Sequence, residues 1–441
     1  MDIREQLRLL QTAEGDPARL ALATVDLAFP TLSDGERTEL KTALEAASLP
    51  HWCDADLLAA LLEVPVQASR ERLSRLRRLK VLEPFPARGE QAVNVHEAAR
   101  LDLRRWLIAH RPESFRTWSQ RAAEHFAADP SPAARIEWIY HRLGYDPDRA
   151  ATELECLNRD WSGSARPEDR QALAIALQEL LAANALDGRA RVWAMLCVAW
   201  ARDTRGETAQ LGDQARAILD LAADIRDRTA IADAQCLVGD VLQAQGKLSE
   251  AQAAFGEYLA ISRRLVEQDP GNASWQRSVG VAHSRVGDVV QAQGKLFEAQ
   301  AAFGEDLAIC RRLAEQDPSN AGWQRDLAVA HSRVGAILQA QGRLGEAQAA
   351  FGEDLGISRR LAEQDPSNAE WQRDLALGCS RVAGLLKASG RYQDALPLYE
   401  EAARIFVDLV ERCPDFAAWS GERDTVQREL ELCRDNIRKT P

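Results

Sequence analysis

Residues 239–286 read GDVLQAQGKLSEAQAAFGEYLAISRRLVEQDPGNASWQRSVGVAHSRV, and the same pattern starts again at Gly287 and at Gly335, with a diverged copy near Ala383. Four tryptophans mark this period of 48 residues: Trp275, Trp323, Trp371 and Trp419. A segment of this length cannot bury its own apolar face, so such segments stabilise one another by stacking in a row. The repeat therefore predicts an extended array, an architecture suited to holding other proteins.

Each repeat is expected to contain two helices. Apolar residues at steps of three or four predict a first helix, called helix A, through Trp275, Val279, Ala282, Val286 and Val290. A second stripe predicts helix B through Leu296, Ala299, Phe303, Leu307, Ile309 and Leu313. Gly294 suits a left-handed end of helix A, and Pro318 suits either the stop of helix B or the first turn of the next helix A.

The block VGDVVQAQGKLFEAQAAF, residues 286–303, resembles the tetratricopeptide repeat. The family's glycine, turn, alanine and aromatic positions match Gly287, Gly294, Ala299 and Phe303. The family's unit has about 34 residues, so each helix of this chain should be about two turns longer. The resemblance covers roughly Gln235 to Arg434 and implies a mostly all-α fold, an α-solenoid of antiparallel hairpins closed by a polar helix from about Glu422.

By the family's pattern, helix A lines the inner, concave wall and presents the partner-binding residues. That wall would carry Ser284, Arg285, Asp288, Gln291, Ser332, Arg333, Gln339, Ser380, Arg381 and Lys387. The three arginines, Arg285, Arg333 and Arg381, would lie one above another and could bind carboxylates of an acidic peptide through forked, charge-assisted bonds. Alternatively, each arginine pairs with an acidic residue of a neighbouring helix. The two central copies differ at 11 of 48 positions, so recent duplication also explains why these residues recur.

The pattern changes between residues 51 and 127. CDADLLAALLEV and VQASRERLSRLRRLK predict two helices, VLEPFPARGEQAVNVH predicts two short strands around Arg88 and Gly89, and a further helix follows. Helix, helix, strand, wing, strand is the order of a winged helix. LEPFPARGEQAVNVHEAARLDLRRWL also resembles the winged-helix module of STAND signalling NTPases, with His96 at the family's histidine.

The second of these helices is basic, and it offers a possible docking or DNA-binding face. Leu73, Leu76 and Leu79 share one side, which leaves four arginines on the other: Arg70, Arg75, Arg77 and Arg78. That face suits phosphate contact. However, the segment 51–127 carries 13 Lys and Arg against 10 Asp and Glu, and the helix offers little to read base edges. STAND-type winged helices mediate protein contacts, so protein docking is favoured over DNA.

The remaining regions are assigned by composition. Residues 1–50 predict an N-terminal helical segment, 128–236 degenerate helical hairpins, and 237–437 the solenoid with its capping helix. The net charge of −12 argues against general affinity for nucleic acid or anionic membrane. No apolar run is long enough to span a membrane and the N-terminus lacks a secretory signal, so a cytoplasmic protein is expected.

Motifs of catalysis and metal binding are missing from the sequence. GDVLQAQGKL (239–248) is not a phosphate loop, because six residues separate the glycines and Leu248 replaces the required hydroxyl residue. No CxxC pair and no nucleophile motif occurs. We therefore expect no enzyme activity, cofactor or metal. The first function hypothesis is a scaffold or regulator that binds a bacterial signalling or defence effector, such as a caspase-like protease, as the resemblance implies. The alternative is a winged-helix transcription regulator with a solenoid sensor.

Overall fold

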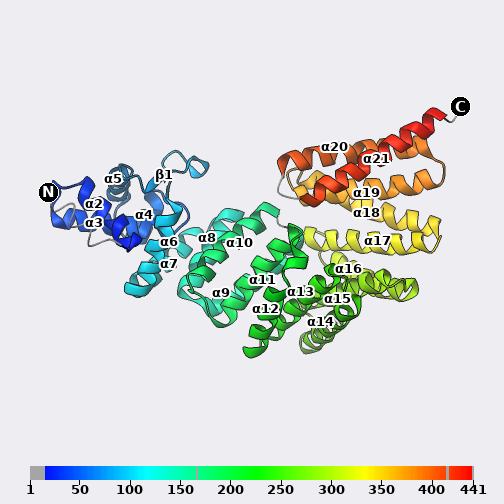
Figure 1. Ribbon diagram of the computed structural model, residues 1–441, viewed down its shortest axis with the longest axis horizontal. Coiled ribbons are helices and arrows are strands. Elements are labelled where there is room, and N and C mark those ends of the chain that lie inside the picture. Colours follow the sequence, from blue (N-terminus) through cyan, green and yellow to red (C-terminus); the bar gives the residue numbers. More distant parts are fainter. Residues whose placement is uncertain (1–14, 165–166, 414–416, 440–441) are drawn as a thin grey trace. The chain divides into compact units, whose positions relative to one another are not determined.

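The structure is a computed structural model that describes residues 15–164, 167–413 and 417–439. Its elements carry the labels of Figure 1. The chain divides into two compact units. The first, the N-terminal unit, comprises residues 1–154 with 175–194, and the second, the array unit, comprises residues 155–174 with 195–441. The three helices α9 (Pro147–Ser164), α10 (Pro167–Ala182) and α11 (Gly188–Thr204) contribute residues to both units.

Short helices and one small sheet build the N-terminal unit. In chain order they are α2 (Pro17–Ala28), α3 (Asp34–Ala47), α4 (Ala55–Leu62), α5 (Val66–Leu76), β1 (Leu82–Pro84), the 3₁₀ turn η1 (Pro86–Arg88), β2 (Val93–Val95), α6 (Glu97–His110), α7 (Pro112–Phe126) and α8 (Pro132–Tyr145). Side chains at helix starts fix several boundaries. Ser33 and Glu36 form a capping box on α3, and the carboxylate of Asp54 accepts a hydrogen bond from the backbone N–H of Leu57.

The small sheet lies between α5 and α6 in the sequence. β1 and β2 pair antiparallel, with Leu82 opposite Val95, and Cys53 adds an isolated bridge to Val93. Gly89 turns the chain between the strands at a φ of 122°, which favours glycine. A single apolar core runs from Ala18 to Ala134, so α2 and α3 share the core of the helices and strands that follow.

Helix α5 is shorter than the sequence predicted. It ends at Leu76, so Arg77 and Arg78 lie in the turn beyond it and not on the helix. The backbone N–H of Arg78 donates to the carbonyl of Arg75 at 3.0 Å, and that of Leu79 to Leu76 at 2.8 Å. These shorter-range bonds tighten the last turn and redirect the chain toward β1.

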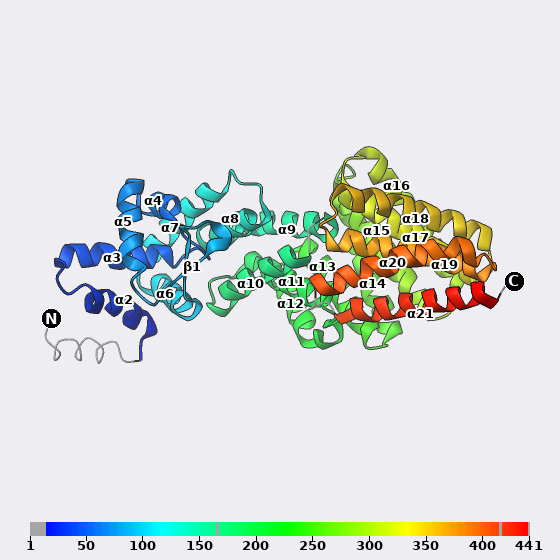
Figure 2. The same ribbon diagram turned by 90° about the horizontal axis from the view of Figure 1, so that it is seen from above.

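The array unit is a row of antiparallel helical hairpins, shown from two sides in Figures 1 and 2. After the 3₁₀ turn η2 (Thr208–Gln210) its helices are α12 (Gly212–Asp224), α13 (Arg228–Ala244), α14 (Leu248–Gln268), α15 (Ala273–Ala292), α16 (Leu296–Gln316), α17 (Ala321–Ala340), α18 (Leu344–Gln364), α19 (Ala369–Ala388), α20 (Tyr392–Arg412) and α21 (Ala417–Lys439). The odd-numbered helices α13 to α19 correspond to helix A and α14 to α20 to helix B. The predicted lengthening is confirmed, since the repeated helices have 20 or 21 residues.

Recurring residues set the ends of these helices. Gly294 has a φ of 81°, and the backbone N–H of Lys295 donates to the carbonyl of Val290 at 2.9 Å, so α15 ends in the left-handed cap that was predicted. Asn320 caps the next inner helix by accepting from the backbone N–H of Trp323 at 3.0 Å. Pro318 lies in the turn between α16 and α17, so it stops helix B and does not begin helix A.

Close packing explains the glycine that opens each copy. A Cβ atom on Gly287 would lie 2.5 Å from the ring of Phe303, and Gly335 stands in the same relation to Phe351 at 2.7 Å. Helices A and B therefore approach more closely than an alanine would allow. One part of the predicted helix B stripe was wrong, because Asp306 and Cys310 are buried in α16 and Leu307 and Ile309 are only partly so.

Candidate ligand-binding site

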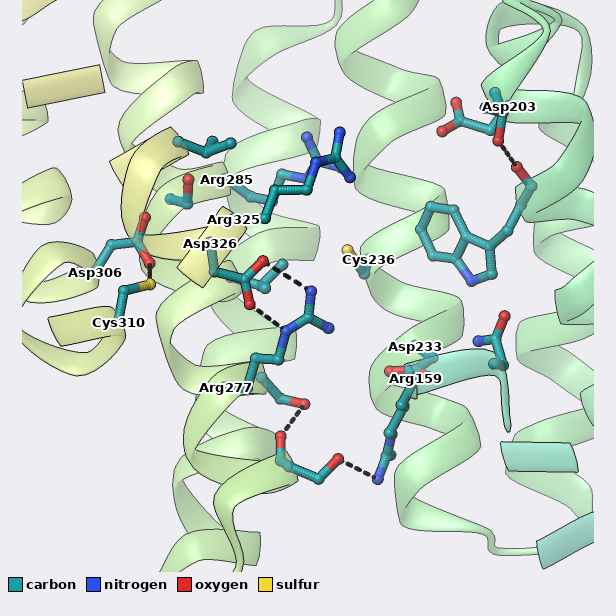
Figure 3. Close-up of a pocket in the computed structure, with 18 of the residues that line it drawn as sticks. Arg159, Asp203, Asp233, Cys236, Arg277, Arg285, Asp306, Cys310, Arg325 and Asp326 are labelled. Carbon is teal, nitrogen blue, oxygen red and sulfur yellow. Dashed lines mark hydrogen bonds and ion pairs between the residues drawn. The ribbon is translucent and has the colours of Figure 1, made fainter. Parts of the chain in front are cut away.

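A cavity of about 550 Å³ lies in the array unit against the inner helices, α13, α15, α17 and α19. Figure 3 shows the cavity with the side chains of neighbouring helices pointing into it. Its positively charged lining comprises Arg159, Arg170, Arg277, Arg285, Arg325, Arg333 and Arg373. Its acidic lining comprises Asp203, Asp233, Asp306, Asp326 and Glu370. Arginines therefore outnumber carboxylates by two in a chain whose net charge is −12.

Three arginines of the lining, Arg277, Arg325 and Arg373, form ion pairs from one repeat to the next, and these pairs are named here the ladder. The Nε of Arg277 on α15 lies 2.5 Å from the Oδ2 of Asp326 on α17, and its Nη2 donates to the Oδ1 at 3.0 Å. These two side chains face each other across adjacent inner helices in Figure 3. Arg325 repeats the contact with Asp374 at 2.5 Å, and Arg373 repeats it with Glu422. Each forked pair fastens one hairpin to the next.

Arg325 has a second acidic partner. Its Nη1 lies 2.8 Å from the Oε2 of Glu370, in addition to its bond with Asp374. Burial of this guanidinium opposes its charge, but the two carboxylates outweigh that effect and raise its pKa. Arg325 therefore stays charged at any physiological pH.

Four carboxyl groups of the array titrate in an unusual range. They are Asp233, Asp240, Asp306 and Asp354, and burial raises the pKa of each to about 6. Asp233 and Asp306 line the cavity itself. The positive excess of the lining therefore grows when the pH falls from neutrality toward 5.

The arginines predicted from the sequence all hold acidic partners inside the molecule. Arg285 pairs with Asp240 at 3.2 Å, and Arg333 bonds both oxygens of Asp288 at 3.2 Å. Arg381 turns instead to the outer helix, where its Nη1 donates to the Oδ2 of Asp354 at 3.0 Å. The alternative, in which each arginine pairs with an acidic residue of a neighbouring helix, therefore describes these contacts. The side chains of Arg285, Arg333 and Arg381 are 31%, 28% and 36% exposed, so each keeps part of its surface in contact with solvent.

The other predicted wall residues are divided between core and surface. Ser284 and Ser332 are buried, although Ser284 still contributes to the cavity lining. Ser380 and Gln291 are partly buried, Gln339 is exposed, and Lys387 pairs with Glu429 on α21. Among the ten predicted residues, the cavity lining includes Ser284, Arg285 and Arg333.

Sequence reasoning missed the ladder that Arg277 begins. Its signal was present, because an arginine follows each of the first three tryptophans by two positions. An acidic residue follows by three positions from Trp323 onward, whereas Ser278 holds that place in the first copy. Since each arginine reaches forward by one repeat, Ser278 needs no acidic side chain, and the exception at the first copy agrees with the contact.

The basic face of the N-terminal unit is exposed as predicted, but its side chains also have partners. Arg75 lies 3.8 Å from Glu36, Arg70 donates to Gln67 at 3.4 Å, and Arg77 donates to Gln91 at 2.8 Å. The guanidinium of Arg78 stacks over the ring of Phe29 at 5.3 Å. Two of the four arginines thus lie on α5 and two lie in the turn beyond it, which weakens the case for one continuous phosphate-binding helix.

A second charged cluster is buried within the N-terminal unit. Glu179 on α10 accepts bonds from Arg100, at 2.6 Å, and from Arg104, both on α6. His51 lies 2.7 Å from Glu137 on α8 and 3.4 Å from Glu179. The cavity beside this cluster measures about 10 Å³, which is too small for a ligand. We name these five residues the buried network and interpret their contacts as interactions that stabilise the fold of the N-terminal unit.

The described residues also bear on metal binding and on membrane insertion. Residues 15–164, 167–413 and 417–439 contain no cluster of three His, Cys, Asp or Glu side chains arranged to hold a metal ion. Among the described helices, none combines the length and the apolarity that a membrane crossing requires.

Comparison with known proteins gave distant structural likenesses. No protein-family model and no curated protein matches the chain. A Rap protein complexed with competence and sporulation factor is 14% identical, with 90% of this chain and 99% of that chain covered at a TM-score of 0.41. A STAND protein with a tetratricopeptide repeat sensor from Pyrococcus horikoshii is 11% identical (98% and 72% covered, TM-score 0.38). BtubC from P. vanneervenii is 18% identical (58% and 92% covered, TM-score 0.39). None of these likenesses assigns a partner to this chain.

Proposed function

We propose that this protein is an interaction scaffold whose inner helices bind an extended, acidic segment of a partner protein. The observation that carries the proposal is the cavity of about 550 Å³ in the array unit, where arginines outnumber carboxylates within an acidic chain. Its volume falls within the range of about 300–1,000 Å³ that is usual for ligand pockets.

Electrostatics favours an acidic ligand over a basic one. The surface of a chain with a net charge of −12 repels acidic peptides in general, so a local excess of arginine would select where they bind. Guanidinium groups bind carboxylates through two parallel bonds, and the side chains of Arg333 and Arg381 keep part of their surface exposed. A ligand carboxylate would exchange with, or add to, the internal acidic partners.

We propose a class of partner protein and not an individual protein. The resemblance to effector-linked repeat proteins suggests a bacterial signalling or defence effector, for example a caspase-like protease.

We also infer that residues 51–127 form a winged-helix-like module, because two helices, a strand, a turn and a strand follow one another there and Cys53 adds a third pairing. Since its arginines hold internal partners, protein docking is the role we assign to it, and we expect no shift of duplex DNA in a low-salt gel assay.

The test is a binding titration with a fluorescein-labelled peptide of alternating Glu and Ala, followed by fluorescence anisotropy. A matched peptide with Gln in place of Glu is the ligand control. We expect binding of the Glu peptide alone, weakened by added salt. Charge reversal of three inner arginines, Arg285→Glu, Arg333→Glu and Arg381→Glu together, should abolish it.

The chain offers a matched control for this triple variant. Arg264, Arg312 and Arg360 also recur every 48 residues, but they lie exposed on the outer helices α14, α16 and α18. Reversing these three to Glu changes the net charge equally and should leave most of the binding intact. Equal loss in both triple variants, with circular dichroism showing both folded, would reduce the effect to overall charge and refute the inner-helix site.

A further inference from the structure

One position on the inner helices breaks the repeat, and it does so beside an arginine. The residue after the opening position of each copy is Asp240, Asp288 and then Ala336. The first two are aspartates, and each pairs with the arginine of the next inner helix, Arg285 or Arg333. In the third copy that internal carboxylate is missing opposite Arg381.

The contacts of Arg381 show the consequence of this gap. Arg333 uses its Nε and Nη2 edge to bind both oxygens of Asp288. Arg381 instead uses Nη1 to bond Asp354, and no acceptor within the described residues bonds its Nε or Nη2. The edge best shaped for a forked bond is therefore open, on a side chain that is 36% exposed.

We propose that a carboxylate of the acidic ligand binds the Nε and Nη2 edge of Arg381, in the place that Ala336 leaves free between α17 and α19. The ligand thus supplies the acidic group that Asp240 and Asp288 supply in the first two copies. This inference rests on the proposed function and adds to it the register at which the ligand is anchored.

Two features prepare Arg381 for this role. The bond from Nη1 to Asp354 fixes the guanidinium plane before a ligand arrives, so less side-chain freedom is lost on binding. Ala336 is partly buried and packs, like Val334 and Val382, against an apolar cluster, so its methyl group offers Arg381 no acceptor.

The decisive variant introduces an aspartate at position 336, where the first two copies have one. Ala336→Asp would fill the site from within and should weaken binding of the Glu peptide by about tenfold or more. Ala336→Asn is the matched control, because it has the same shape without the charge and should cost far less affinity. Equal affinities in these two variants would overturn the proposal.

The reverse exchange in the preceding copy tests the same rule by a gain. Asp288→Ala would open the equivalent edge of Arg333, which is itself partly exposed, and should tighten binding of the Glu peptide several-fold. Affinity that stays at the wild-type value would contradict the proposal. This variant also keeps the test valid if Ala336→Asp fails to fold.

The outcomes separate this inference from the function on which it rests. A wild-type protein that binds neither peptide overturns both. Wild-type binding that the inner triple reversal abolishes, but that Ala336→Asp and Ala336→Asn affect equally, preserves the scaffold function and refutes only the anchoring by Arg381.

Discussion

The buried network of the N-terminal unit and the ladder of ion pairs that Arg277 begins in the array unit use the same chemical groups in different surroundings. In the network, the side chains of Arg100, Arg104 and Glu179 are all less than 10% exposed. In the ladder, Arg277 and Asp326 are 20% and 21% exposed. The difference teaches which charges are fixed parts of the fold and which remain able to exchange partners with a ligand.

Solvent decides the energetic role of each set. A charge that has lost its water depends on its partner, so removal of one member leaves the other stranded. A charge that keeps contact with water can rehydrate when its partner is removed, and the pair then contributes little. We therefore assign stability to the buried network and ligand exchange to the ladder and its neighbours on the inner helices.

The largest expected effect comes from Glu179→Ala. Loss of this carboxylate leaves Arg100 and Arg104 buried without their acidic partner, and we expect the free energy of unfolding to fall by about 3–5 kcal/mol. Urea unfolding followed by circular dichroism measures the total loss. Hydrogen-exchange mass spectrometry should locate the lost amide protection in α6 and α8, with α15 to α19 unchanged. A loss below about 1 kcal/mol would remove the distinction between the two regions.

Much of the array could be predicted from the sequence because its signals recur. Several signals recur in each copy: the 48-residue period, the glycine that ends helix A at Gly294, and the glycine that packs against Phe303. Because these residues repeat in phase, their agreement with a helical hairpin is not a coincidence of one segment. The ladder from Arg277 to Asp326 obeyed the same period. It was overlooked because its two members lie 49 residues apart, and nothing within one copy shows that an arginine reaches into the next.

The buried network could not be predicted, for a physical reason. His51, Glu137 and Glu179 come from three distant parts of the chain, and each occurs once. Only the fold brings Glu137 on α8 and Glu179 on α10 to His51, which lies between α3 and α4, and no spacing in the sequence encodes that arrangement. The gap at Ala336 lies between these cases, since the sequence shows the exception, whereas only the contacts of Arg381 show what it leaves open.

The two regions should also respond differently to acid between pH 7 and pH 5. In the array, the pKa values of Asp233, Asp240, Asp306 and Asp354 are raised by burial to about 6, above the usual value of an unfolded chain. Their stabilising contribution is complete below pH 3.8 and is lost as the pH rises through 6. Acidification from pH 7 to pH 5 should thus stabilise the array by about 1 kcal/mol for each carboxyl.

The buried network should change little over the same range. Burial opposes the ionisation of Glu179, but the hydrogen bond from His51 and the charges of Arg104 and Arg100 outweigh it and lower its pKa to about 2. Its contribution is present above pH 4.5 and is lost only as the pH falls through 2. Burial lowers the pKa of His51, but its contacts with Glu137 and Glu179 outweigh that effect and raise it, so protonation of His51 stabilises the fold on acidification. His141, which lies 3.4 Å from Glu137, has a pKa lowered by burial, so its protonation has the opposite effect.

Peptide-resolved hydrogen exchange, corrected for the intrinsic pH dependence of amide exchange, compares both regions in one sample. Protection in α13 to α19 should rise at pH 5 while protection in α6 and α8 stays nearly constant. Asp306→Asn removes one titrating group and should reduce the array's pH response by its share. An array whose protection falls at pH 5 would show that these carboxyls are ionised and needed as charges.

The smallest effect is expected for Asp326→Ala, the counterpart of the Glu179 variant in the ladder. Arg277 loses a forked partner, but one-fifth of its side chain already meets solvent, so we expect a loss of about 1 kcal/mol. The same variant raises the positive excess of the cavity, so titration with the Glu peptide should show equal or tighter binding. A stability loss as large as that of Glu179→Ala would mean that the ladder, like the buried network, is fixed, and that its arginines are not free to exchange a carboxylate of the fold for one of a ligand.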